Sequence, residues 1–137
     1  MPYLEHRLTR RVLFYETDLA GIVHFSCYLR YMEEAEHALW RAAGLTIAPP
    51  DHSIGFPRVS VTCEYAAPLY FEDEFEVHVR IDKLGPRTIH YAHVLTRGTT
   101  KVATGTIITA CVIPAPGQRP RASEIPPAIV ARLRGDN

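Results

Sequence analysis

The segment from residue 14 to residue 25, FYETDLAGIVHF, brings a carboxylate, a glycine and a histidine together ahead of a helical pattern. Asp18 stands between two hydrophobic runs, where an ionised side chain is costly unless it is paired or put to use. A carboxylate of this kind can attack a carbonyl carbon directly, or it can deprotonate a water molecule that does so. Asp18 is therefore the first candidate for a catalytic group.

A long amphipathic helix is predicted immediately after this segment, from about Ser26 to Ala43. Its apolar residues recur at spacings of three and four, Ser26 suits the N-cap, and Gly44 suits the position that ends the helix. Such a helix would be about 26 Å long. Its first N–H groups lack intrahelical acceptors and carry partial positive charge, so they could stabilise an oxyanion formed near Asp18.

Strands are predicted on both sides of this helix. Residues 6–15 place Leu8, Val12 and Phe14 on one face, and residues 58–65 and 75–82 alternate apolar and polar side chains. Residues 87–96 and 101–113 follow turns, and the last segment is apolar on both faces, which predicts a central strand. A loop is expected over residues 45–57 and a short helix over 128–133. The order predicts an α+β domain spanning 1–137, with an antiparallel sheet wrapped around one helix.

Bulk properties exclude several classes of protein. The chain has 137 residues, with 47% hydrophobic and 22% charged, which is ordinary globular composition, and its formal net charge is zero. Binding to nucleic acid, insertion into a membrane and a signal peptide are therefore not expected. Three widely spaced cysteines without a CxxC motif, and histidines outside any ligand array, argue against disulfides and metal and favour a cytoplasmic protein.

The segment FYETDLAGIVHFSCYLRYMEEAE resembles the signature of the 4-hydroxybenzoyl-CoA thioesterase-like branch of the hotdog-fold acyl-CoA thioesterases. The resemblance continues through RVSVTCEYAAPLYFEDEFEV, with its aromatic-x-x-Pro turn, and through PRASEIP, which Tol–Pal-associated members also carry. It implies a hotdog fold with five antiparallel strands around one long helix. It also implies hydrolysis of an acyl-CoA to a carboxylic acid and free CoA, with no cofactor because coenzyme A is part of the substrate.

The resemblance implies roles for four residues of the motif. Asp18 would be the nucleophile or the general base, and the sequence leaves both open. The backbone N–H of Phe25 would bind the thioester carbonyl, and Gly21 would allow a tight turn close to the substrate. His24 would either line the substrate or hydrogen-bond to it, and a solvent-facing loop position is equally in keeping with the sequence. Cys27 stands where the family often has asparagine or serine, and we interpret it as a small buried residue of the first helical turn, not a nucleophile.

Substrate-binding residues are less well defined by the sequence. Tyr15 is a candidate for the acyl pocket, although a core position is the more usual one for such a tyrosine. The loop around 51–56 is expected to contribute to the pocket. The phosphates of CoA would suit Lys83, Arg87 and Thr88 around the Gly85 turn, with Arg58 as a weaker candidate. The resemblance implies a homodimer or homotetramer, with sites at the subunit interface.

Competing functions remain on the same fold. A non-catalytic module that binds acyl-CoA or an acyl carrier would not need Asp18 at the tip of a helix. A thioesterase for acyl-carrier protein would show a basic docking face in place of phosphate-binding residues. A dehydratase or hydratase would need a histidine with an acid partner in another context, and that signature is not found.

Overall fold

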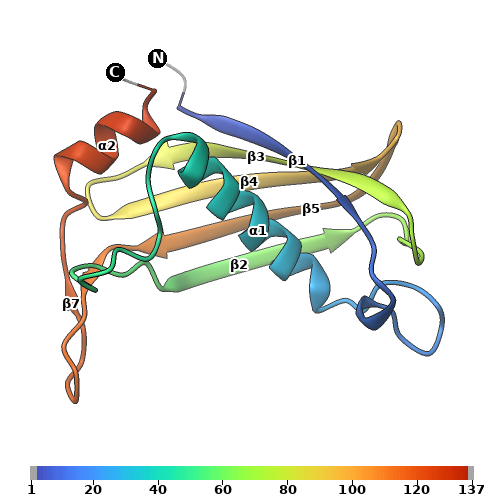
Figure 1. Cartoon of the computed structure of the whole chain (residues 1–137), viewed down its shortest axis with the longest axis horizontal. Helices are drawn as coiled ribbons and strands as arrows, with labels where there is room; N and C mark the ends of the chain where they lie inside the picture. Colours follow the sequence, from blue (N-terminus) through green and yellow to red (C-terminus); the bar gives the residue numbers. More distant parts are fainter. Residues whose placement is uncertain (1–2, 136–137) are drawn as a thin grey trace.

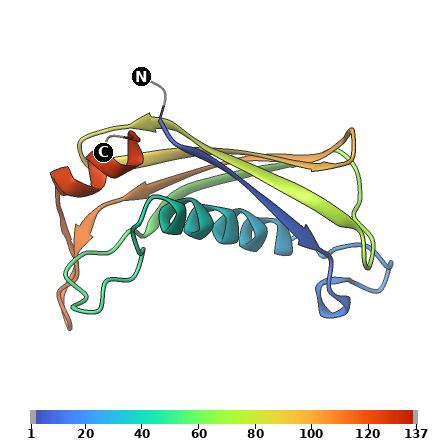
Figure 2. The ribbon, with the colours of Figure 1, turned by 45° about the horizontal axis from the view of Figure 1, so that its top comes forward.

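Five strands form one antiparallel sheet in the computed structural model, which describes residues 3–135. In the order β1-β3-β4-β5-β2, they are β1 (Glu5–Arg11), β3 (Glu74–Leu84), β4 (Thr88–Arg97), β5 (Thr100–Ala110) and β2 (Arg58–Tyr65). The sheet curves around the long helix α1 (Cys27–Ala42), which lies along its concave side (Figures 1 and 2). The predicted α+β architecture is confirmed.

Short elements complete the chain. A 3₁₀ turn, η1 (Phe14–Glu16), follows β1, and a small hairpin pairs β6 (Val112–Ile113) with β7 (Arg121–Ala122). The short helix expected near the end is α2 (Pro127–Leu133), which lies beside the first strand (Figure 1) and accepts a hydrogen bond from Leu4 N to Leu133 O at 3.0 Å. The hairpin was not predicted. No helix within residues 3–135 is long and apolar enough to cross a membrane.

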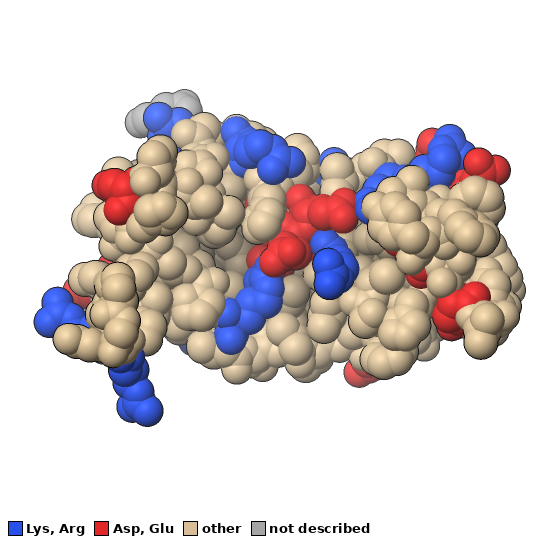
Figure 3. Space-filling model, turned by 60° about the horizontal axis from the view of Figure 1, so that its bottom comes forward, with Lys and Arg blue, Asp and Glu red and all other residues tan. Residues whose placement is uncertain are grey.

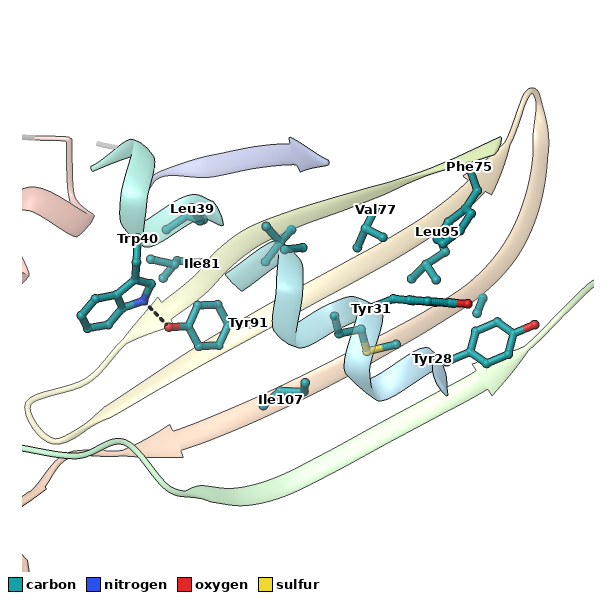
Figure 4. Packing of buried hydrophobic residues seen from close by; sticks show 14 of the residues in the cluster. Tyr28, Tyr31, Leu39, Trp40, Phe75, Val77, Ile81, Tyr91, Leu95 and Ile107 are labelled. Carbon is teal, nitrogen blue, oxygen red and sulfur yellow. Dashed lines mark hydrogen bonds between the residues drawn. The ribbon is translucent and has the colours of Figure 1, made fainter. Parts of the chain in front are cut away.

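The core lies between α1 and the concave face of the sheet (Figure 4). One helix face buries its large side chains against alternate residues of the inner strands, as the two periodicities require. The largest members of this core include Tyr31, Met32, Leu39, Trp40, Tyr91, Leu95 and Ile107. Gly105 on β5 makes room for Met32, because an added Cβ would lie 2.7 Å from the Met32 sulfur and 2.8 Å from Thr62 O.

One expectation about the sheet is confirmed and another is wrong. β5 is an interior strand, because it pairs with β4 on one side and with β2 on the other. The apolar face predicted for residues 58–65 is largely exposed, with Val59 60% exposed and Val61 and Tyr65 also open. The reason is position, since β2 is an edge strand and α1 packs most closely on β1 and β3. Alternation identifies a strand face but not whether anything covers it.

The first strand and the helix start also differ from expectation. β1 ends at Arg11, four residues before the predicted end, and Phe14 is 73% exposed and not on the buried face with Val12. Ser26 occupies the N-cap position in αR geometry, but its side chain makes no capping bond. At the other end, Gly44 has φ +78°, as the predicted helix stop requires, and its N–H donates to Arg41 O at 3.0 Å.

Candidate active site

Asp18 lies in a tight loop whose backbone fixes its carboxylate. Asp18 N donates to Ile22 O at 2.8 Å, and Gly21 N donates back to Asp18 O at 3.0 Å. Gly21 has φ +84°, a conformation that glycine adopts without strain. The Asp18 Oδ1 atom accepts from Ala20 N at 2.8 Å and, more weakly, from Ile22 N at 3.4 Å. No described residue donates to Oδ2, which leaves that oxygen available for chemistry.

The Phe25 N–H lies just ahead of α1, beside this loop. Cys27 N donates to His24 O at 2.9 Å, and Ser26 N donates to His24 Nδ1 at 3.2 Å. Phe25 N precedes these two donors in the chain. It has no acceptor among residues 3–135. His24 therefore accepts hydrogen bonds from the Ser26 and Cys27 N–H groups. The Phe25 N–H, at the positive end of the helix, remains available for an incoming oxygen.

Asp18 and Phe25 line the same pocket, which has a volume of about 470 Å³. Its other walls are mostly apolar and come from the loop, the first turn of α1 and the segment after β2: Ile22, Val23, Tyr28, Tyr65, Ala66, Ala67 and Pro68. Such a lining suits an acyl group, while the two polar groups suit its carbonyl carbon and oxygen.

Tyr65 holds the helix start in place, a role that sequence reasoning missed. Its hydroxyl donates to Phe25 O at 2.9 Å, and its ring meets Tyr28 edge-on at 4.9 Å between centroids. The bond fixes the peptide next to the free Phe25 N–H. The aromatic-x-x-Pro turn that begins at Tyr65 was the only signal in the sequence that pointed to this residue.

A buried ion pair supports the loop from behind. Arg10 on β1 binds both carboxylate oxygens of Glu16, at 2.8 and 2.6 Å. The same carboxylate accepts from Leu13 N at 2.8 Å and from the Tyr31 hydroxyl at 3.0 Å, which ties η1 to β1 and to α1. Arg10 also pairs with Glu34 at 2.7 Å. The segment that precedes the Asp18 loop is therefore anchored to both β1 and α1.

The charge of Glu16 is maintained by these partners. Burial alone would raise the pKa of Glu16, but the hydrogen bonds from Arg10, Leu13 and Tyr31 outweigh it and lower the pKa below its ordinary value. Burial would likewise lower the pKa of Arg10, whereas its bonds to Glu16 and Glu34 raise it overall. Both groups are therefore ionised at neutral pH.

Cys27 lies in the first turn of α1, and its surroundings do not activate its thiol. Burial, followed by the negative charge of Glu16, raises the pKa of the Cys27 thiol, so the thiolate is disfavoured. Its Sγ lies 3.7 Å from Glu16 O, in the position of a weak donor. The interpretation of Cys27 as a packing residue fits this environment.

The other candidates in the motif and loop lie apart from the pocket lining. His24 is exposed, stacks on the Phe25 ring at 4.6 Å between centroids, and has Nδ1 2.7 Å from the Ser26 hydroxyl. Tyr15 is 81% exposed on η1, neither in the core nor in the pocket. In the loop around 51–56, Phe56 lines a different cavity.

The basic candidates do not meet Asp18 within one chain. Arg58 is held by Glu36 at 2.9 Å and by Glu33 at 3.4 Å, at the end of β2 away from Tyr65. Lys83, Arg87 and Thr88 surround the β3–β4 turn, at the opposite end of the sheet from the Asp18 loop (Figure 1). Their proposed contact with CoA therefore requires a second subunit.

Charged side chains of both signs gather midway along the helix side of the molecule, flanked by uncharged surface (Figure 3). Neither sign forms a broad patch on this face. Within residues 3–135, no three His, Cys, Asp or Glu side chains come together in a way that could hold a metal ion.

Known proteins are similar to this chain in sequence and fold. Residues 12–133 match the thioesterase-like superfamily. A crystal structure of a hypothetical protein from Aquifex aeolicus is 31% identical and superposes with a TM-score of 0.84, covering 93% of this chain and 98% of that one. A gentisyl-coenzyme A thioesterase structure is 27% identical, with a TM-score of 0.84 over 93% of this chain and 99% of that one.

A further relative is also named as an enzyme that acts on a CoA thioester. A 1,4-dihydroxy-2-naphthoyl-CoA hydrolase of Synechococcus elongatus is 27% identical over 111 residues, which is 79% of this chain and 82% of that protein. The two structural superpositions show that the fold agrees with these relatives over nearly the whole chain. The chain belongs to the thioesterase-like superfamily and is a hotdog-fold thioester hydrolase.

Proposed function

We propose that the protein hydrolyses acyl-CoA thioesters at the pocket shared by Asp18 and Phe25. One observation carries the proposal: Asp18 Oδ2 and the Phe25 N–H both lack partners among the described residues, and both residues line one apolar pocket. A thioester carbonyl placed there would meet a negative oxygen at carbon and an electropositive donor at oxygen. These are the two elements that acyl transfer to water needs.

Asp18 takes one of two roles in this reaction. As a nucleophile, Oδ2 attacks the carbonyl carbon, the CoA thiolate leaves, and water hydrolyses the resulting mixed anhydride. As a general base, the carboxylate takes a proton from the water that attacks. In either case the Phe25 N–H stabilises the oxyanion, and loss of such a donor typically costs on the order of 3 kcal/mol in the barrier.

The acyl group is proposed to be aromatic. The relatives named above act on gentisyl-CoA and on dihydroxynaphthoyl-CoA. The rings of Tyr28 and Tyr65 form part of the pocket wall and would pack against a flat acyl group. The chain itself needs no cofactor in this scheme, because coenzyme A enters and leaves with the substrate.

A second copy of the chain would complete the site. β2 is an edge strand with unpaired outer backbone groups and exposed Val59 and Val61, so pairing of two such strands would join the sheets. In such a homodimer, or a tetramer built from it, Lys83, Arg87 and Thr88 of one copy would serve the Asp18 of the other. We expect the protein to act in the cytoplasm, where its three free thiols would stay reduced.

Hydrolysis of a matched substrate panel tests this function. The wild-type protein is offered aromatic, short and long acyl groups, each on CoA and on acyl-carrier protein, and released thiol is followed. The proposal expects the aromatic CoA thioesters to have the highest kcat/KM. It also expects Lys83→Ala with Arg87→Ala to raise KM for CoA thioesters only. Preference for the carrier protein would favour that alternative, and binding without turnover of any thioester would favour the non-catalytic module.

A further inference from the structure

A second cavity lies between the middle of α1 and the sheet, and it shares no lining residue with the Asp18 pocket. Its volume is about 320 Å³. Apolar groups and the Tyr91 ring form much of its wall, while charged groups stand beside them: Glu33, Glu36, His37, Ile47, Phe56, Pro57, Arg58, Tyr91 and Thr109. The mechanism proposed above uses none of these residues.

Two buried polar side chains that line this cavity each carry an oxygen atom without a hydrogen-bond partner. Glu36 and Thr109 are each more than nine-tenths buried, yet Glu36 Oε2 and Thr109 Oγ1 have no hydrogen bond among the described residues. His93, behind them on β4, is fully buried and has no bond at either ring nitrogen, although Nε2 lies 3.3 Å from Glu36 Oε2. Natural proteins rarely leave such groups unpaired, which points to an occupant.

The charges around Glu36 restrict what this occupant can be. Arg58 donates to Glu36 Oε1 at 2.9 Å, so this carboxylate already has its ionic partner. Arg58 also pairs with Glu33 at 3.4 Å, so a second cation would have to compete with Arg58 for the two carboxylates, and an anion would be repelled by both of them. A neutral group that donates to Oε2 and accepts from the Thr109 hydroxyl meets neither penalty. A hydroxyl group does both at once.

Tyr91 adds a further donor to the same cavity. Its oxygen accepts from the Trp40 indole N–H at 2.9 Å, as the dashed line in Figure 4 shows. Burial raises the pKa of Tyr91, so the hydroxyl keeps its proton and can donate it. The polar part of the cavity can therefore both give and receive hydrogen bonds, while Ile47, Phe56 and Pro57 suit an apolar body.

We propose that this cavity is a binding site for a small neutral molecule that carries a hydroxyl group on an apolar body, held between Glu36 and Thr109. The inference rests on the buried unpaired atoms and the cavity, and it does not depend on the reaction at Asp18. Occupancy would satisfy polar atoms at the point where α1, β4 and β5 meet.

The protein contains a built-in reporter for this site. Trp40 is the only tryptophan in the sequence. Its indole N–H binds Tyr91, and its ring meets Phe56 at 5.1 Å between centroids, so two lining residues contact it. The indole N–H resonance in a ¹⁵N-labelled sample should shift when the cavity fills.

Titration with three ring compounds tests the proposal. Phenol supplies a neutral hydroxyl, fluorobenzene supplies a similar shape without it, and benzoate supplies a negative charge. Phenol should shift the Trp40 indole resonance saturably and bind at least about threefold more tightly than the other two, the effect of one hydrogen bond. Equal affinity for phenol and fluorobenzene, or no shift with phenol, would overturn the proposal.

Two variants separate the site from the catalytic pocket. Thr109→Val removes the hydroxyl and keeps the shape, and it should reduce phenol affinity about threefold or more while leaving fluorobenzene binding as it was. Asp18→Asn should leave phenol binding unchanged, because the two cavities share no residue. Phenol binding that disappears with Asp18→Asn and survives Thr109→Val would place the ligand in the catalytic pocket and refute the inference.

Discussion

Glu16→Gln should destabilise the protein by removing the charge that anchors the Asp18 loop. The side chains of Glu16 and Arg10 are 8% and 17% exposed, so this pair is largely shielded from water. Breaking a buried pair from one side costs about 3–5 kcal/mol. Glutamine keeps the shape and one acceptor oxygen, and Arg10 keeps its pairing with Glu34. We therefore expect Glu16→Gln to lower the free energy of unfolding by about 2 kcal/mol at pH 7. Urea unfolding of both proteins, followed by circular dichroism, measures this difference in the free energy of unfolding.

The pH dependence gives the same prediction a second readout. The pKa of Glu16 is lowered in the folded state, so the carboxylate contributes its full stability above the ordinary value near 4.5. That contribution is lost as pH falls through the lower folded-state pKa. The stability difference between wild type and Glu16→Gln should therefore shrink in acid below about pH 4.5.

A matched exposed pair provides the control for this experiment. Arg11 and Glu74 are 58% and 62% exposed, and Glu74→Gln should change the free energy of unfolding by less than about 0.5 kcal/mol. The reasoning fails if Glu16→Gln costs no more than Glu74→Gln at pH 7. It also fails if the deficit of Glu16→Gln grows in acid.

Two further predictions concern the helix start and the core. Tyr65→Phe removes the hydrogen bond to Phe25 O, so kcat should fall about threefold to tenfold while the melting temperature stays nearly unchanged. A marked fall in the melting temperature alongside the fall in kcat would argue against this positioning role. Gly105→Ala should lower the free energy of unfolding by about 1–3 kcal/mol, because the new Cβ meets Met32 and Thr62 O. A free energy of unfolding equal to that of wild type would contradict this, and would show that Met32 moves aside without strain.

The order and type of the main elements could be predicted because each has a clear period. The helix after Ser26 and the strands at β3 and β4 follow directly from spacings of three to four and of two. Exposure of Val59 and Val61 could not be predicted, because strand alternation does not show which strand lies at an edge.

The site was partly predictable from the sequence for the same reason. Asp18, Gly21 and Phe25 are close in the chain and precede the helix, so local reasoning brings them together. Tyr65 and Arg10 act through contacts between distant segments, which one sequence does not display. The unpaired Glu36 and Thr109 atoms likewise arise only when α1 packs on the sheet.

Hydrolysis of an aromatic acyl-CoA by Asp18→Asn, beside wild type and the exposed-site control Asp82→Asn, tests the central claim most directly. Loss of the carboxylate charge at position 18 should lower kcat by about a hundredfold or more with the fold retained, whereas Asp82→Asn should turn over as wild type does. Wild-type turnover by Asp18→Asn would show that the carboxylate at the tip of α1 does not perform the chemistry.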